Sequence, residues 1–497
     1  MKKFISIVLM LLLMIAFLVA CSETQEPKLD NGSSELCEHN WELSEFVTED
    51  TDVPFAGVFV CKQCEKKTIR SIAYTDIDIP LISVTGDLGS VYENEKGLSK
   101  EIKVVADFSY QSKDYCLNSF ASFTYQGKST KDDPKKNYSV NILDSNADKK
   151  QKVTFDESWG AGSKYALKAN YIDPIGVRDI SLATLYGQIS HSAESDDPFS
   201  SLVNGGAVDG YPVLFYLNGK YQGLYTWNIR KDKWLYGMDS DDAGEAVICG
   251  SAVDELKNDE GITIPLDEGM RTSKSWEYEY VNENYGEDGW ALASFNSMLY
   301  AVKHADQGAL RAVIEEYTIL DRLLDVVLFN VIFGMADNIS GNQVWCTYDG
   351  KKWTPVPYDL DRTLGRDGEP LIEADIPLTD CLPENVLYTL IFQAYYEDIK
   401  SRYSQLRENI LTTENVLSIL EDKLRGVDDR YFAAEEKKWP DADWRKSENA
   451  EDITGIRAEL DYIEDYLNKR FAYCDAFFAE NDAASIIATL TVDPDIA

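Results

Sequence analysis

The stretch from Gly334 to Asp361 constrains the fold of this chain more than any other. Its residues predict the end of a helix, a polar loop, a β-hairpin and an acidic loop. Asp349-Gly350 is expected to form a tight two-residue turn, because both central positions of a type I′ turn need positive φ, which Asp-Gly tolerates. The arms at 344–348 and 351–356 are rich in β-branched and aromatic residues, as strands are.

Pairing the arms about that turn brings polar side chains together at the open end of the hairpin. Asn342 then lies opposite Pro357 and therefore beside Asp359. Asp337 precedes Asn342 in the chain, and Asp361 follows Asp359. Four oxygen-bearing side chains are thus expected to converge.

Such a set of side chains suits phosphoryl transfer. Mg²⁺ prefers oxygen ligands, usually one or two carboxylates with phosphate oxygens and water. Protein kinases place an Asp base, an Asn ligand in the spacing D-x-x-x-x-N and a metal-binding Asp in that order. Asp337, Asn342 and Asp359 repeat this order. Two plainer interpretations stay open: solvated acidic residues at a hairpin mouth, or a structural Ca²⁺ site.

The first twenty residues predict a secretory signal peptide. Lys2 and Lys3 form a charged region, and an apolar region follows. The segment ends Leu-Val-Ala-Cys21, which is similar to the lipobox of bacterial lipoproteins, so Cys21 is the expected site of lipid attachment. The rival interpretation is an uncleaved anchor, but the apolar region is shorter than the ~20 residues of a membrane span. Residues 21–35 are polar and predict a flexible tether.

The chain is strongly acidic, which narrows its partners. Removal of residues 1–20 takes away two lysines and changes the formal charge from −38 to −40. This charge argues against nucleic acid, because its phosphates would be repelled. It fits an extracytoplasmic protein whose partners are cations or basic peptides, and the expected lipid on Cys21 would anchor that protein to a bacterial membrane.

A small cysteine-rich module is expected at residues 36–73. Cys37-x-His39 and Cys61-x-x-Cys64 together offer three thiolates and one imidazole. This is the closed tetrahedral ligand set of structural Zn²⁺ sites, and the segment is similar to short zinc-ribbon-like modules. Disulfides in an oxidising compartment are the alternative.

Secondary-structure patterns divide the remainder into a β-rich amino-terminal half and a helical carboxy-terminal half. An Asn218-Gly219 turn predicts a second hairpin, and residues 239–289 are expected to form a surface insertion. The class expected is α+β with two lobes, as in protein kinases. Strands are expected at 80–84, 102–108, 119–125, 135–142 and 164–169, and helices at 178–188, 318–335, 385–395, 403–411, 413–427 and 456–479.

Five segments in this order resemble the spore-coat CotH kinase family. They are Gln126-Gly-Lys-Ser-Thr with Pro134-Lys-Lys, Leu167-Lys-Ala-Asn-Tyr-Ile-Asp-Pro with Arg178, Tyr216-Leu-Asn-Gly-Lys-Tyr-Gln-Gly-Leu-Tyr, Asp337-Asn with Asn342, and Pro357-Tyr-Asp-Leu-Asp-Arg-Thr-Leu-Gly. The resemblance implies an atypical kinase-like domain over residues 76–480, followed by a tail at 481–497. Active members of the family transfer the γ-phosphoryl group of ATP to Ser or Thr of coat proteins, and others act as adhesins on fungal surfaces.

The resemblance also implies roles for individual residues. Asp337 would be the base that orients the acceptor hydroxyl, and Asn342, Asp359 and Asp361 would hold Mg²⁺. The expected cations near ATP are Lys136, Lys168 and Arg178.

The chain departs from the family pattern in two places. The segment at 126–129 reads Gln-Gly-Lys-Ser, where the family often has Arg-Gly-Asn-Ser. Asn228-Ile229-Arg230 stands where the family often has a Glu. In kinases an acidic residue pairs with the phosphate-binding Lys. The absence of Glu here supports the alternative of a catalytically silent protein.

Taken together, the motifs predict a membrane-anchored, ATP- and Mg²⁺-dependent Ser/Thr kinase of basic surface or coat proteins. A catalytically silent adhesin or assembly protein is the alternative.

Overall fold

The computed structural model describes residues 37–93, 99, 101–127, 129–193, 195–239, 241, 243–250, 276–366, 372–380, 382–442 and 454–490. The predicted signal peptide, the tether and Cys21 lie outside these ranges, as do residues 491–497 of the predicted tail. Within the described part of the chain, no helix has both the length and the apolarity needed to cross a membrane.

The chain divides into two compact units. Among the described residues, the smaller unit comprises 37–41 together with Cys61–Lys66, and the larger unit comprises Glu42–Val60 and the described residues from Lys67 onward. Three short strands, β1 (Trp41–Phe46), β2 (Ala56–Cys61) and β3 (Lys67–Ser71), form a sheet in the order β1-β2-β3.

Seven strands of the larger unit close into a barrel with the order β10-β8-β7-β6-β5-β4-β9. Only the β4–β9 pair is parallel among these strands. Buried aromatic rings fill the barrel, and the ring of Trp227 stacks on Tyr165 with centroids 4.9 Å apart. The strands are β4 (Leu81–Thr85), β5 (Val104–Gln111), β6 (Cys116–Tyr125), β7 (Tyr138–Leu143), β8 (Lys164–Lys168), β9 (Gly210–Leu217) and β10 (Lys220–Ile229).

The predicted hairpin at Asn218-Gly219 is confirmed as β9–β10. Asn218 has φ 52° and Gly219 has φ 76°, and Leu217 pairs with Lys220 across the turn. Both central residues thus have the positive φ that a two-residue hairpin turn needs.

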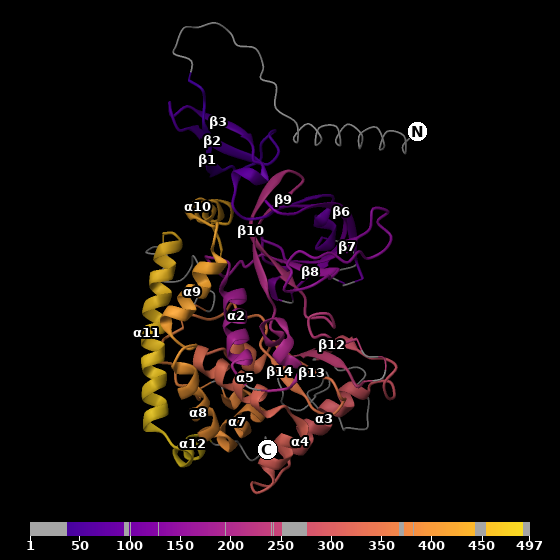
Figure 1. Cartoon of the computed structure of the whole chain (residues 1–497), viewed down its shortest axis with the longest axis vertical. Helices are drawn as coiled ribbons and strands as arrows, with labels where there is room; N and C mark the ends of the chain where they lie inside the picture. The colour runs from indigo at the N-terminus through magenta and orange to yellow at the C-terminus, as the bar shows by residue number, and fades with distance from the viewer. Residues whose placement is uncertain are drawn as a thin grey trace. The chain divides into compact units, whose positions relative to one another are not determined.

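Helices dominate the carboxy-terminal part of the larger unit, so the α+β class is confirmed (Figure 1). Helix α5 is buried almost throughout, and α2 packs against it. The long helix α11 runs past α9 and α8 in Figure 1, and the Tyr403 hydroxyl of α8 donates to the Asp475 carboxylate of α11 at 2.6 Å. The helices are α2 (Arg178–His191), α3 (Trp290–Lys303), α4 (Leu310–Tyr317), α5 (Leu320–Phe333), α6 (Ala336–Ser340), α7 (Val386–Ala394), α8 (Tyr396–Arg407), α9 (Thr413–Lys423), α10 (Asp429–Lys438), α11 (Ile456–Glu480) and α12 (Ala483–Thr489).

A four-stranded antiparallel sheet, in the order β12-β11-β13-β14, carries the hairpin of the candidate site. Its strands are β11 (Ala246–Gly250), β12 (Trp276–Val281), β13 (Gln343–Thr347) and β14 (Thr354–Val356). The prediction of a surface insertion at 239–289 is wrong for β11, which is largely buried and pairs with strands on both sides. Residues 251–275 lie outside the described ranges.

The two-residue turn predicted at Asp349-Gly350 is also wrong. Val344 pairs with Val356 and Cys346 with Thr354, which shifts the expected register by one residue and leaves a six-residue loop at 348–353. The Asp349 carboxylate causes this, because its Oδ1 accepts the backbone N–H groups of Lys351 at 2.8 Å and Lys352 at 2.7 Å. An Asp that caps its own loop in this way competes with a tight turn.

Candidate functional site

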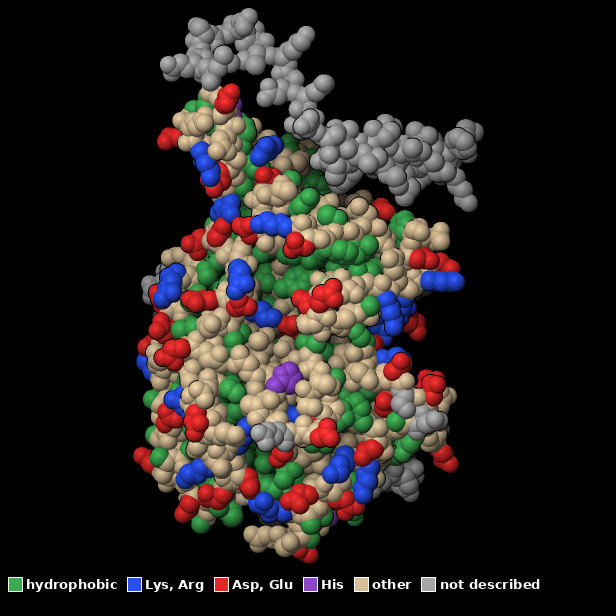
Figure 2. Space-filling model, viewed as in Figure 1, with side chains coloured by type: hydrophobic (Ala, Val, Ile, Leu, Met, Phe, Trp, Pro, Cys, Tyr) green, Lys and Arg blue, Asp and Glu red, His purple; other side chains and the backbone are tan. Residues whose placement is uncertain are grey.

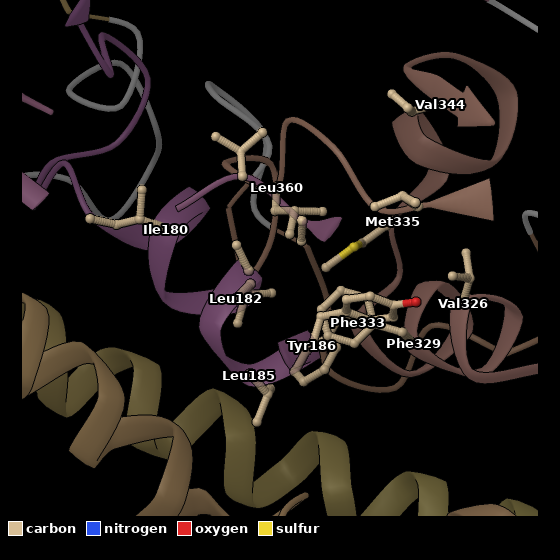
Figure 3. Close-up of a cluster of buried hydrophobic side chains, with 14 of the residues drawn as sticks. Ile180, Leu182, Leu185, Tyr186, Val326, Phe329, Phe333, Met335, Val344 and Leu360 are labelled. Atoms are coloured by element: carbon tan, nitrogen blue, oxygen red, sulfur yellow. The ribbon is translucent and has the colours of Figure 1, made fainter. Parts of the chain in front are cut away.

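Packing of α2 against α5 forms the floor of the candidate site. Figure 3 shows Leu182 and Tyr186 of α2 facing Phe329 and Phe333 of α5, with Leu360 of the acidic loop above them. The rings of Tyr186 and Phe329 meet edge to face at 5.5 Å. Ring pairs of this kind add to the stabilisation from buried apolar area, so this contact strengthens the packing of α2 on α5 beneath the site. It fixes the first turn of α2 below residues 358–361 and fixes the loop that follows α5.

The loop after α5 begins with a glycine cap. Gly334 adopts φ 63° and ends the helix, and α6 then carries Asp337 at an exposed position. The amide nitrogen of Asn342 donates to the Asp337 carboxylate at 2.9 Å. The two residues predicted as base and metal ligand are therefore in direct contact.

Lys168 and Asp359 form the central ion pair of the site. Lys168 is the last residue of β8, and its Nζ donates to Oδ1 of Asp359 at 2.8 Å. Only 13% of the Lys168 side chain and 30% of the Asp359 side chain are exposed. Burial alone would raise the pKa of Asp359, but the charge and hydrogen bond of Lys168 hold that pKa below its ordinary value. Asp359 thus stays ionised beside a protonated lysine.

Asp361 and Asp179 crowd this pair with further negative charge. Burial and the nearby Asp359 carboxylate raise the pKa of Asp361 well above its ordinary value. Burial also raises the pKa of Asp179 from 3.8 to about 6, against the opposing effect of Lys168. Three carboxylates thus share one closely paired lysine, and such a site favours an additional cation.

Asp179 is the site residue that sequence reasoning missed. It follows Arg178 in the first turn of α2, and its Oδ1 accepts the backbone N–H of Leu360 at 2.9 Å. This bond holds the acidic loop between Asp359 and Asp361. A carboxylate in the first turn of a helix that is otherwise buried was the available signal, because such a helix rarely buries an unpaired charge.

Asn338 fixes the same loop from the opposite side. Its side-chain oxygen accepts the backbone N–H of Tyr358 at 3.3 Å, and its amide nitrogen donates to the Asp359 carbonyl at 3.5 Å. Asp359 adopts φ 62° and Asn342 φ 30°, a region that costs most side chains energy. Residues held in this way are typical of functional sites.

Two further cations lie near the carboxylates. Arg362 Nε lies 4.0 Å from the Asp337 carboxylate, and Arg362 also lowers the pKa of Asp359. Lys231 Nζ lies over the Tyr358 ring at 3.9 Å and contacts Cys249 Sγ at 2.8 Å. Arg362 therefore connects the Asp337–Asn342 pair to the Asp359 cluster.

The side chains of Arg178 and Lys136 pair with groups outside the carboxylate cluster, which consists of Asp179, Asp359 and Asp361. Arg178 is fully buried, and its guanidinium pairs with Asp173 and Glu459, which also pairs with Arg366. Such a network is typical of a structural role.

Lys136 Nζ donates to the Lys131 carbonyl at 2.7 Å and lies over the Tyr92 ring at 4.9 Å. The neighbouring Lys135 is the buried member of the pair, and it contacts Glu435 of α10 at 2.7 Å. Lys168 alone of the three predicted cations lies at the cluster.

Within the smaller unit, Cys37, His39, Cys61 and Cys64 come together. Their four ligand atoms all lie within 4.8 Å of one another. The predicted metal-ligand set is therefore assembled in space.

Comparison with known proteins identifies one family. The family model described as CotH kinase protein matches residues 123–474, which is well over half of the chain. This region contains β8, α2, α5 and the β13–β14 hairpin, so Lys168, Asp179, Asp359 and Asp361 all fall within the match. No curated protein matches the chain.

Proposed function

The chain belongs to the CotH kinase family, and from this we propose that it transfers the γ-phosphoryl group of ATP to Ser or Thr hydroxyls of proteins. The observation that carries the proposal is the Lys168–Asp359 ion pair, with Asp179 and Asp361 beside it and the Asp337–Asn342 pair connected through Arg362. A base, a phosphate-binding cation and oxygen ligands for metal ions are the groups that protein kinases use.

The oxygen donors fit Mg²⁺. Asp359, Asp361 and Asn342 offer hard oxygen ligands. Burial and the charge of Asp359 raise the pKa of Asp361, and a divalent cation would offset that repulsion. Bound Mg²⁺ would neutralise charge on the phosphate oxygens during transfer. Asp359 and Asp361 would be its carboxylate ligands, and the bonds from Asp179 and Asn338 hold the loop that carries them.

Lys168 supplies the fixed positive charge at the phosphates. It stands at the end of a barrel strand whose backbone is paired on both sides, so its position is set by the sheet. Asp359 keeps it protonated and directs its Nζ toward the metal ligands. In this arrangement the β-rich and helical parts correspond to the two lobes of a kinase.

Asp337 orients the acceptor hydroxyl and accepts its proton. Its side chain is 47% exposed, so a protein substrate can reach the carboxylate. Asn342 donates to one of its oxygens and thereby fixes the carboxylate plane. General bases of this kind contribute about 10²–10⁴-fold to rate.

The charge of the chain points to a basic acceptor. The formal charge is −38, and acidic side chains are spread over the face shown in Figure 2 rather than gathered in one patch. Attraction to a Lys- and Arg-rich protein would be long-ranged and weakened by salt.

We further propose that the mature chain is attached to the outer face of a bacterial membrane through a lipid on Cys21. Incorporation of labelled fatty acid into wild type but not into Cys21→Ser tests the attachment.

Phosphate transfer to a basic, Ser-rich peptide tests the activity. Asp337→Asn and Asp359→Asn should each lower the rate by at least about a hundredfold, because base and metal ligands act together. Asp148→Asn is the matched control, since Asp148 is exposed in the connection between β7 and β8. Equal rates in all four proteins would remove the proposal.

A silent binding protein is the second candidate. Asn228 stands where the family often has Glu; it is buried on β10, and its side-chain oxygen has no hydrogen-bond partner among the residues that the structure describes. Calorimetry with ATP and Mg²⁺ separates the two functions. Tight, metal-dependent ATP binding supports the kinase, and absence of binding supports the adhesin or assembly role.

A further inference from the structure

We propose that Cys37, His39, Cys61 and Cys64 bind one Zn²⁺ ion as a closed structural site. The kinase proposal makes no use of these residues, which belong to the smaller unit. The four ligand atoms lie within 4.8 Å of one another. The inference stands whether or not the chain transfers phosphate.

The distances between ligand atoms match a tetrahedron around zinc. Cys37 Sγ and Cys61 Sγ are 3.7 Å apart, and Cys64 Sγ lies 3.3 Å from His39 Nδ1. Zn–S bonds of ~2.3 Å at tetrahedral angles give a sulfur–sulfur separation of ~3.8 Å. The observed separation agrees with this value, and the Nδ1 contact makes that nitrogen the histidine ligand.

The backbone between Cys61 and Cys64 forms a zinc knuckle. Glu65 N–H donates to the Cys61 carbonyl at 2.9 Å, and Cys61 N–H donates to the Lys66 carbonyl at 2.9 Å. Glu65 adopts φ 59° to close this turn. The turn directs the Cys61 and Cys64 thiols to the same side. A Cys-x-x-Cys pair needs this arrangement to bind one ion.

A backbone hydrogen bond aligns the second pair of ligands with the knuckle. Lys62 N–H donates to the Asn40 carbonyl at 2.8 Å, which holds the segment of Cys37 and His39 against the turn. The His39 ring also packs on Trp41 with centroids 4.8 Å apart. A metal bound by ligands from both segments would link them and so stabilise this unit.

A disulfide explains the cluster less well. The Cys37–Cys61 sulfur distance of 3.7 Å is far longer than a disulfide bond of ~2.05 Å. Any disulfide within the cluster would also leave one thiol and the imidazole unused. All four ligands come from the protein, so no coordination position is left for a substrate, and the ion would be structural.

Metal analysis of the purified full-length chain tests the site. We expect one zinc per chain after gel filtration, and loss of that zinc in Cys61→Ser and Cys64→Ser. Cys116→Ser is the matched control, because Cys116 is an exposed cysteine outside the cluster. Zinc retained in both cluster variants, or absent from the wild type, would overturn the proposal.

Two measurements on the wild type guard against a misfolded variant. Replacement of zinc by Co²⁺ should give the intense visible absorption of a tetrahedral thiolate site. Chelation should open residues 37–41 and 61–66 to proteolysis, while Mg²⁺-dependent phosphate transfer stays within about twofold. A disulfide found among the three cysteines of the untreated chain, by alkylation and mass spectrometry, would contradict the zinc site without bearing on the kinase.

Discussion

Lys168 and Asp359 are 191 positions apart in the chain, and their side chains meet at 2.8 Å. One ends a barrel strand and the other follows the β13–β14 hairpin. This contact joins the barrel to the loop that follows the four-stranded sheet.

Neutralising either partner of this pair should abolish most of the activity. Lys168→Met leaves three carboxylates without their closest cation, and Asp359→Asn removes a metal ligand. We expect each to lower the transfer rate by at least about a hundredfold, and the double variant to be little slower than the worse single one, because the two groups act as a unit. Steady-state rates of the four proteins measure this, with Lys149→Met, an exposed lysine, as control. Losses that add independently would show that the pair does not work as a unit.

Removing the charge of Asp361 should have opposite effects without and with Mg²⁺. Asp361→Asn relieves repulsion from Asp359, so the metal-free variant should unfold at a higher temperature than wild type. Mg²⁺ should stabilise wild type by about 2.7 kcal/mol at a hundred times its dissociation constant and stabilise the variant much less. Thermal unfolding with and without Mg²⁺ measures both effects. A variant that gains as much from Mg²⁺ as wild type does would exclude Asp361 as a ligand.

Asp179 should make the metal-free protein less stable as pH rises. Its pKa is 3.8 in the unfolded chain and about 6 in the fold, so between these values the folded state binds more protons. The contribution of Asp179 to the free energy of unfolding therefore falls across this window as pH rises, by at most about 3 kcal/mol at ~1.4 kcal/mol per pKa unit.

Asp179→Asn keeps an acceptor for Leu360 N–H and should remove this fall. Urea unfolding of both proteins between about pH 4 and pH 6 measures the difference. Parallel profiles for the two proteins would contradict the assignment.

Glu459 should be essential for stability rather than for chemistry. It is fully buried, and its carboxylate pairs with Arg178 and Arg366. Glu459→Gln removes the carboxylate that the buried Arg178 and Arg366 guanidinium groups share and leaves Arg178 paired with Asp173, which should cost about 3–5 kcal/mol of unfolding free energy. Glu480→Gln, exposed at the end of the same helix, should change it by less than about 0.5 kcal/mol. Near-equal stability of the Glu459 variant would show that the network is not structural.

Local sequence patterns predicted the parts of the fold whose geometry is set within a few residues. The Asn218-Gly219 turn needs positive φ at both positions, which few other dipeptides tolerate. The apolar spacing of 318–335 predicted the buried helix α5, and Gly334 ends it. The six-residue loop at 348–353 was missed because the Asp349 side chain accepts two backbone N–H groups, which no strand pattern reveals.

The site was predicted in part for the same reason. The spacing of Asp337 and Asn342 places them within one short helix and its following turn, and they are in contact. Asp179 was missed because its partner Leu360 is 181 positions away. The role predicted for Arg178 was not found because its side chain pairs with Glu459, 281 positions away, and not with Asp359. A charged residue on a predicted helix carries no local sign of which distant loop it will meet.

The sequence by itself determined the family, the α+β class and the residue types that can hold a metal or a phosphate, because each depends on local order and spacing. Tertiary structure alone decided which of the candidate cations lies beside Asp359 and which is enclosed in a buried network. Closure of the barrel and packing of α2 on α5 set those neighbours, and burial then sets the charge states of the carboxylates. The neighbours of each side chain and the charge states of the carboxylates both depend on contacts between distant segments. A short stretch of sequence does not reveal those contacts.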